Sequence, residues 1–142
     1  MKFLIFEGAD RVGKTTLIHE FQKLTNYKYL IADRLFVSQL VYEKLFNRII
    51  SLKDYTELYT NMLKLKNFMI FVHVDCSEEK LKQRILSDKT HKNQLQEILQ
   101  AKKLFTETFE QFKETFEIIH IDTTKTSSEQ LAKELLNKLE SR

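Results

Sequence analysis

The sequence predicts an α/β fold with a parallel sheet of about four strands and helices on both faces. Apolar segments typical of buried strands alternate with segments whose apolar residues recur at helical spacing, in the order β-α-β-α-α-β-α-α-β-α. Strands joined through helices pair in parallel, and their helices cover both faces of the sheet. The only two glycines, Gly8 and Gly13, follow the first expected strand directly, although average usage would give a chain of 142 residues about ten. Glycine is therefore kept where the backbone passes close to another group.

The composition fits one domain over residues 1–142. A chain of this length buries enough surface to fold without disulfides, and the single Cys76 cannot form an internal one. The 23 basic and 20 acidic side chains give a net charge of +3, which is too weak to indicate nucleic-acid binding by itself. The sequence shows no secretory leader and no long apolar run, so we expect a cytoplasmic protein without a membrane partner.

The first expected strand, residues 2–6, leads into Gly8-x-x-x-x-Gly13-Lys14-Thr15, the full P-loop or Walker A pattern. In such a loop backbone N–H groups and a helix N-terminus face phosphates, Lys14 reaches the β and γ phosphates, and the Thr15 hydroxyl ligates Mg²⁺. An apolar helical stripe follows, so the match has the strand and helix that it requires. The sequence thus predicts a three-layer P-loop NTPase fold that binds ATP and Mg²⁺; the alternative is a surface turn that matches by chance. The expected nucleotide-binding residues are Gly8, Ala9, Asp10, Arg11, Val12, Gly13, Lys14, Thr15 and Thr16.

Residues 27–33 are expected to form a second buried strand that ends at Asp33. The carboxyl ends of strands are where open α/β sheets bind ligands, and P-loop proteins keep there an acid that holds Mg²⁺. Asp33 is therefore the candidate metal ligand beside Thr15. The alternative is a helix N-cap, which Asp also favours.

Two helices are expected within residues 35–50 and 55–63, with their aromatic side chains in the core. Residues 68–75 then form a third strand, in which His73 is expected to be a packed core histidine rather than a metal ligand. The topology rules place Asp75, at the end of this strand, with the P-loop and Asp33 along one edge of the sheet.

Ser77 is expected to cap a helix that runs to about Ser87. The polar segment 88–93 after it is either a short lid over the phosphates, with Arg84, Lys89 and Lys92 as contacts, or a solvated turn between helices. Beyond it we expect a long helix with an apolar stripe over residues 95–116, a fourth strand over 117–122, and a last helix that begins with the capping box Ser127-x-x-Gln130.

The loop FEGADRVGKTT resembles the P-loop of thymidylate kinases, Glu-Gly-x-Asp-x-x-Gly-Lys-Ser/Thr-Thr, and matches it from Glu7 to Thr16. The pair Asp33-Arg34, followed by Ser38 and Tyr42, is similar to the Asp-Arg motif of that family. Residues 71–84 are similar to the segment before its lid. The likeness covers most of the chain and points to the nucleoside and nucleotide kinases.

The resemblance implies that Arg11 and Lys14 hold the donor phosphates and that Thr15 holds Mg²⁺. It further implies that Asp10 binds the sugar hydroxyl of the acceptor, and that Asp33 and Arg34 hold the metal and the acceptor phosphate. One subclass of these kinases carries its catalytic arginine inside the P-loop and lacks one in the lid. The chain has Arg11 and no arginine between Arg84 and Arg142, so it fits that subclass; the alternative is that Arg11 is a solvated loop charge.

The chain departs from the family in one segment. A strand and two helices that lie in the family between the P-loop helix and the Asp-Arg strand, and that grip the acceptor, are missing here. Three interpretations stay open: a small nucleotide or nucleoside held by the helices of residues 35–62, a bulky or polymeric acceptor such as a modified base or end in DNA, or a regulatory ATPase or switch without an acceptor. A second subunit in a homodimer would be another way to complete the site. A GTPase is disfavoured because the Asn-Lys-x-Asp motif is absent. The leading interpretation is an ATP- and Mg²⁺-dependent kinase.

Overall fold

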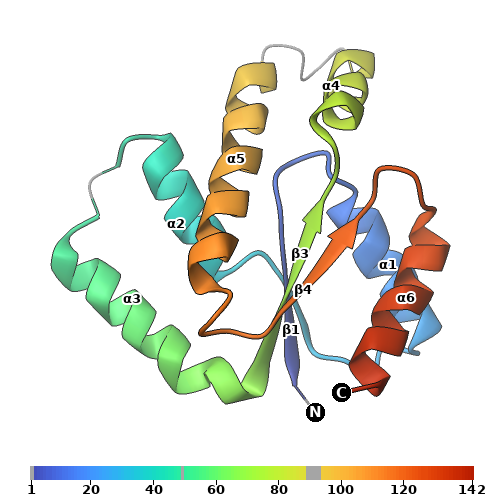
Figure 1. Cartoon of the computed structure of the whole chain (residues 1–142), viewed down its shortest axis with the longest axis horizontal. Coiled ribbons are helices and arrows are strands. Elements are labelled where there is room, and N and C mark those ends of the chain that lie inside the picture. The colour runs from blue at the N-terminus through green and yellow to red at the C-terminus, as the bar shows by residue number, and fades with distance from the viewer. Residues whose placement is uncertain (1, 49, 89–93) are drawn as a thin grey trace.

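The computed structural model describes residues 2–48, 50–88 and 94–142 (Figure 1). Its elements follow the predicted alternation of strands and helices. In chain order they are β1 (Phe3–Glu7), α1 (Lys14–Leu24), β2 (Ile31–Asp33), α2 (Phe36–Leu45), α3 (Leu52–Leu65), the 3-10 helix η1 (Lys66–Phe68), β3 (Met69–Asp75), α4 (Glu78–Ser87), α5 (Leu95–Phe112), β4 (Ile118–Asp122) and α6 (Ser128–Glu140).

The four strands form one parallel sheet in the order β2-β1-β3-β4. Phe6 of β1 is in register with Asp33 of β2 and with Val72 of β3. The chain adds β2 on one side of β1 and β3 on the other, so the strand order reverses beside β1. Ligands of open α/β sheets bind at such a switch point, outside the carboxyl ends of the strands. The loop after β1 therefore lies where the topology favours a ligand.

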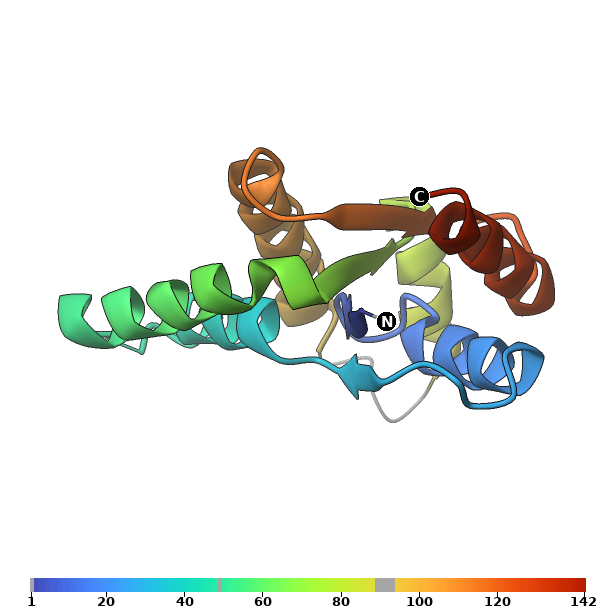
Figure 2. The same cartoon turned by 90° about the horizontal axis from the view of Figure 1, so that it is seen from below.

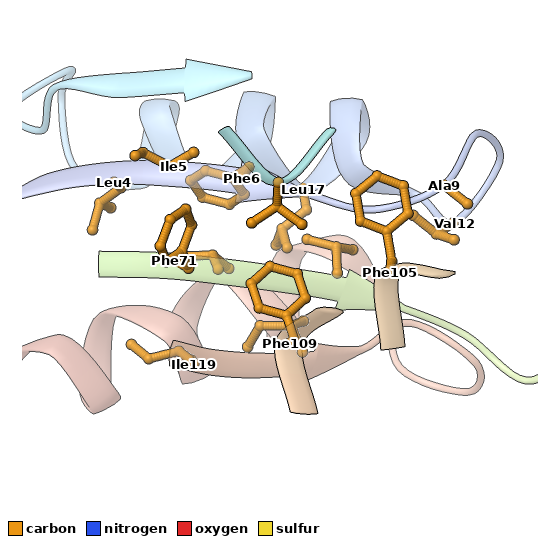
Figure 3. Packing of buried hydrophobic residues seen from close by; sticks show 14 of the residues in the cluster. Leu4, Ile5, Phe6, Ala9, Val12, Leu17, Phe71, Phe105, Phe109 and Ile119 are labelled. Atoms are coloured by element: carbon orange, nitrogen blue, oxygen red, sulfur yellow. The ribbon is translucent and has the colours of Figure 1, made fainter. Parts of the chain in front are cut away.

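Helices cover both faces of the sheet, as predicted (Figure 2). Helices α1 and α6 pack together on one face, and α2 and α5 pack together on the other. Between these layers the buried side chains form one apolar core, in which β1 and β3 contribute Phe6 and Phe71 and α5 contributes Phe105 and Phe109 (Figure 3). The fold class predicted from the sequence is confirmed.

Serine side chains cap three helices at their N-termini. Ser77 Oγ accepts from the N–H of Lys80 at 3.1 Å, and Ser127 Oγ accepts from the N–H of Gln130 at 3.3 Å. Both caps were predicted. Ser51 caps α3 in the same way, which starts that helix three residues before the predicted segment.

Three elements are shorter than predicted by four or more residues: β2, α2 and α5, the last of which ends at Phe112. Asn26 and Tyr27 both adopt positive φ angles, 53° and 58°, in the turn that ends α1, so the chain becomes a strand only at Ile31. Helix α2 ends at Leu45 because Asn47 again turns with a φ of 52°. Ile49 and the expected lid residues Lys89 and Lys92 lie outside the described residues.

Within the described parts of the chain, no helix has both the length and the apolar character needed to cross a membrane. The longest of these helices is α5, with 18 residues.

Candidate functional site at the P-loop

The two glycines of the P-loop are required for different reasons. A Cβ on Gly8 would lie 2.3 Å from the carbonyl oxygen of Val74, so only glycine allows the loop to leave β1 against the backbone of β3. Gly13 has a φ of 93°, in the left-handed region that glycine adopts without strain, and directly precedes Lys14 at the start of α1. The close approach and the sharp turn together explain why glycine occurs at these positions.

Two residues from distant elements hold the outer side of the loop. The guanidinium of Arg84, on α4, donates to the carbonyl oxygen of Arg11 at 3.0 Å and to the carbonyl and hydroxyl oxygens of Thr123 at 3.1 and 3.2 Å. The Thr123 hydroxyl in turn donates to the carbonyl oxygen of Val12. Arg11 itself has a positive φ of 70°. These bonds fix a loop that contains two left-handed residues, Arg11 and Gly13.

A cavity of about 750 Å³ opens beside the loop. Four cationic side chains line it: Arg11, Lys14, Arg34 and Arg84. The other lining residues are Ala9, Asp10, Gly13, Thr15, Thr16, Ser87, Asp88, Gln94, Ile98, Thr123, Thr126 and Ser128. A cavity next to a helix N-terminus, with several cations and hydroxyls, suits a polyphosphate.

Lys14 and Asp33 form an ion pair across the carboxyl ends of β1 and β2. The lysine side chain is only 7% exposed, whereas that of Asp33 is 48% exposed. Helix α2 begins after Leu35 without a side-chain cap, so Asp33 is not the helix cap that the sequence left open. The acid expected to hold Mg²⁺ is thus adjacent to the P-loop lysine.

Arg34 links the loop to helix α2. Its guanidinium is ion-paired with Asp10 and donates to the hydroxyl of Tyr42 at 3.2 Å. Burial raises the pKa of Tyr42, so this phenol stays protonated at neutral pH. Asp10 and Arg34, which the resemblance assigns to the acceptor, therefore form one group with Tyr42.

Glu7 is a site residue whose role the sequence analysis missed. Its side chain is fully buried at the end of β1, and its carboxylate accepts from the N–H of Leu35 at 3.0 Å and from the N–H and hydroxyl of Ser38 at 2.8 and 2.7 Å. Burial raises the pKa of Glu7, although these hydrogen bonds act in the opposite direction. A carboxylate at the end of an otherwise apolar strand was the available signal. Ser38, which follows the Asp-Arg motif, is correspondingly buried and holds Glu7.

A smaller cavity of about 190 Å³ lies between α2 and α5. Tyr42, Leu45 and Phe46 line one side of it, and Glu97 and Ala101 line the other. Asp10, Gln94 and Ile98 line both this cavity and the larger one, so the two cavities adjoin.

The structure brings most of the predicted residues together, with some exceptions. Gly8 and Val12 are buried and do not line the large cavity. They contribute to the site only by forming the backbone of the loop. Asp75 lies at the same edge of the sheet, but its side chain is paired with Lys102 Nζ at 3.3 Å and lines a different cavity. The predicted position of Asp75 at this edge is confirmed, but its side chain does not line the P-loop cavity. Arg11 is exposed and ion-paired with Asp88 at the end of α4, and its role toward the phosphates stays a prediction.

The residues present fit Mg²⁺ and a nucleoside triphosphate. The loop leaves β1 at a position where a Cβ would collide with the backbone, four cations face one cavity, and the exposed Thr15 lies in the first turn of α1. Hydroxyl and carboxylate oxygens are the donors that Mg²⁺ takes beside phosphate oxygens, and Thr15 and Asp33 supply them.

No protein-family model matches the chain. No curated protein sequence matches it at a significant level either.

Solved structures do match it. The YorR protein from Bacillus subtilis, in complex with phosphorylated GDP, superposes with a TM-score of 0.75 at 20% identity, over 98% of this chain and 96% of that one. Deoxyadenosine kinase from M. mycoides superposes with a TM-score of 0.69 at 16% identity in its dATP complex, over 99% of this chain and 100% of that one. The dCTP complex of that kinase gives 0.66 at 16% identity, over the whole of both chains. At these identities the likeness shows the fold alone: the chain has the same α/β fold as these proteins.

Proposed function

We propose that the protein transfers a phosphoryl group from ATP to a nucleoside or nucleotide acceptor. The observation that carries the proposal is the pair of adjoining cavities that share Asp10, Gln94 and Ile98. The larger one is lined by the P-loop and four cations, and the smaller one by apolar and aromatic side chains. A kinase needs such a pair, because the transferred group must lie between a donor site and an acceptor site.

The donor side follows from the charges at the loop. Lys14 and the N-terminus of α1 would bind the β and γ phosphates, and Arg11 would offset the charge that spreads over the transferring phosphoryl oxygens. Thr15 and Asp33 would hold Mg²⁺, which neutralises phosphate charge when it is bound. Because Lys14 is paired with Asp33 and Arg11 with Asp88, both cations must exchange a carboxylate for a phosphate on binding.

The acceptor side follows from the group around Arg34. Asp10 and Arg34 line the large cavity next to the boundary with the small one, where a sugar hydroxyl and a phosphate would meet the donor. Tyr42 and Phe46 have ring centroids 6.0 Å apart and near-parallel planes, 20° to one another, and offer aromatic surface to a base. The solved structures of similar fold support this assignment, since deoxyadenosine kinase carries dATP or dCTP in its complexes. The helices of residues 35–62 would thus replace the missing acceptor segment.

The experiment is a screen of ADP production from Mg²⁺·ATP with nucleosides, nucleoside monophosphates and DNA ends as acceptors. Kinase activity gives turnover that depends on a small acceptor, whereas turnover only with DNA would point to the polymeric acceptor. Turnover that is indifferent to every acceptor would support a regulatory ATPase instead. Lys14→Ala is the control, because it removes a phosphate-binding charge and should abolish turnover; Lys28→Ala, an exposed lysine after α1, should not.

A further inference from the structure

A second polar cavity lies beside β3 and β4 and shares no lining residue with the P-loop cavity. Its volume is about 430 Å³. Two histidines and three acidic residues line it: His73, His120, Asp75, Glu110 and Asp122. Nothing in the proposed kinase reaction uses these side chains.

The two histidines are direct neighbours across the sheet. His73 of β3 is in register with His120 of β4, and the Nδ1 atoms of the two rings are 3.1 Å apart. His73 is 5% exposed and stacks on Phe109, with ring centroids 4.4 Å apart, so its ring is held in place. His120 is exposed on the edge strand. One rigid nitrogen and one accessible nitrogen therefore lie at hydrogen-bond distance from each other.

The next residues on this face repeat the pattern with carboxylates. Asp75 is in register with Asp122, two positions beyond the histidine pair on both strands. Like charges directly opposite each other on neighbouring strands are destabilising. Lys102 on α5 offsets this repulsion through its ion pair with Asp75. The face thus combines two histidine ring nitrogens with a nearby surplus of negative charge, which favours a cation.

The distance between the two Nδ1 atoms is close to the distance between two nitrogen ligands of one metal ion. Two histidine nitrogens that bind one tetrahedral metal at about 2.0–2.1 Å stand about 3.3–3.4 Å apart, so the observed 3.1 Å requires a shift of only a few tenths of an ångström. Within the described residues, no group of three or more His, Cys, Asp or Glu side chains is arranged to hold a metal. Water would therefore complete the coordination.

We propose that His73 and His120 together chelate one transition-metal cation of the Zn²⁺ type, with water in the remaining positions and the carboxylates of Asp75 and Asp122 nearby. Such an ion would join the edge strand β4 to β3. The residue after β4 is Thr123, whose N–H donates to the carbonyl oxygen of Asp75 at 2.9 Å and whose hydroxyl holds the P-loop. The metal would thus stabilise the strand end that supports the loop. This proposal does not depend on the kinase reaction.

Titration of the nucleotide-free protein with Co²⁺ and Zn²⁺, in excess Mg²⁺ to occupy oxygen-ligand sites, tests the proposal. We expect one equivalent to bind, and His120→Gln to weaken binding by more than about 100-fold, the upper end of the loss caused by outer-shell changes. His19→Gln, at an exposed position on α1, is the matched control and should bind as the parent does. Zn²⁺ should also raise the thermal midpoint of the parent and of His19→Gln but not that of His120→Gln.

The proposal would be overturned if the parent showed no saturable binding, or if His120→Gln bound as tightly as the parent. In the second case, Cys76→Ser would show whether the buried thiol that lines the same cavity is the ligand. His73→Gln gives a second measure wherever circular dichroism shows that it folds. If it folds and binds unchanged, the two rings only share a hydrogen bond.

Discussion

The carboxylate of Glu7 accepts two hydrogen bonds from Ser38, one from the backbone N–H at 2.8 Å and one from the hydroxyl at 2.7 Å. Ser38 lies in the first turn of α2, a helix that has no side-chain cap of its own. Glu7, the last residue of β1, therefore supplies a hydrogen-bond acceptor for a backbone N–H group at the N-terminus of α2. Glu7 also accepts from Leu35, directly after Arg34. Glu7 thus fixes the turn that carries Asp33 and Arg34 toward the P-loop.

This relationship predicts a pH-dependent effect of Glu7→Gln. The pKa of Glu7 in the folded protein is raised above its ordinary value of 4.5 by burial, so the folded state binds the proton more tightly than the unfolded state. The stability that this group contributes is fully present below pH 4.5 and is lost as the pH rises through the raised pKa. The free energy of unfolding of the parent, relative to Glu7→Gln, should therefore fall as the pH rises from 4.5, as measured by urea unfolding.

Glu57→Gln, at an exposed position on α3, serves as the control and should show no such trend. A constant difference between parent and Glu7→Gln over the whole pH range would contradict the prediction. Glu7→Ala should cost about 1–3 kcal/mol at any of these pH values, because it leaves buried N–H groups without an acceptor.

Sequence reasoning found the parts of the site that are local. The Gly8 to Thr15 spacing encodes loop, turn and helix start within one segment, and apolar periodicity was enough for the order of strands and helices. It missed the role of Glu7, whose partners are 28 and 31 residues away, and it missed Thr123, which lies 111 residues from Val12. Contacts over such separations leave no periodic signal.

The assignment of Arg84 changes for the same reason. The sequence suggested a contact with the donor phosphates, and Arg84 does line the cavity. Its guanidinium, however, makes hydrogen bonds to the carbonyl oxygen of Arg11 and to Thr123. Those bonds make it a support of the loop, while its role toward ATP stays a prediction.

Thr123 provides a test of that support. Thr123→Val keeps the shape of the side chain but removes the hydroxyl that donates to Val12 and accepts from Arg84. We expect a loss of about 1–3 kcal/mol in the free energy of unfolding, because a buried carbonyl loses its partner, together with a higher KM for ATP. Thr123→Ser retains the hydroxyl and should restore the KM. If valine and serine behaved alike, the hydroxyl would not position the loop.

Arg11 is expected to act on the transferring phosphoryl group. Arg11→Ala should lower kcat by on the order of 10³-fold, by comparison with arginine fingers, and should affect the affinity for ATP less. Arg11→Lys should restore only part of the rate, because an ammonium cannot make the paired contacts of a guanidinium. Arg48→Ala, near the end of α2 and outside the cavity, is the control. A rate within about tenfold of the parent would contradict the arginine-finger comparison.

Asp88 makes the Arg11 prediction sharper. In this structure the Arg11 guanidinium is ion-paired with Asp88, so it must leave that carboxylate to reach a phosphate. We expect Asp88→Asn to lower the KM for ATP or leave it unchanged, and to retain kcat. A loss of kcat as large as that of Arg11→Ala would mean that Asp88 positions the arginine for transfer.

The last prediction concerns the choice of acceptor. A site rejects a wrong base strongly only when its buried polar groups are left unpaired, which can discriminate by about 10⁴-fold. The polar groups that line the small cavity are Asp10, Tyr42, Gln94 and Glu97, and the first two already take part in the contacts of Arg34. Tyr42 and Phe46 instead offer aromatic surface, which stacks on any base. We therefore expect weak discrimination among the four deoxynucleoside monophosphates. Phe46→Ala should lower kcat/KM for all of them by a similar factor without changing the KM for ATP.

Phe68→Ala is the control for this prediction. It removes an exposed ring that lines neither cavity and should leave the steady-state kinetics unchanged. A strong preference for one base, lost in Phe46→Ala, would show that the helices α2 and α5 form a selective pocket and that this prediction is wrong.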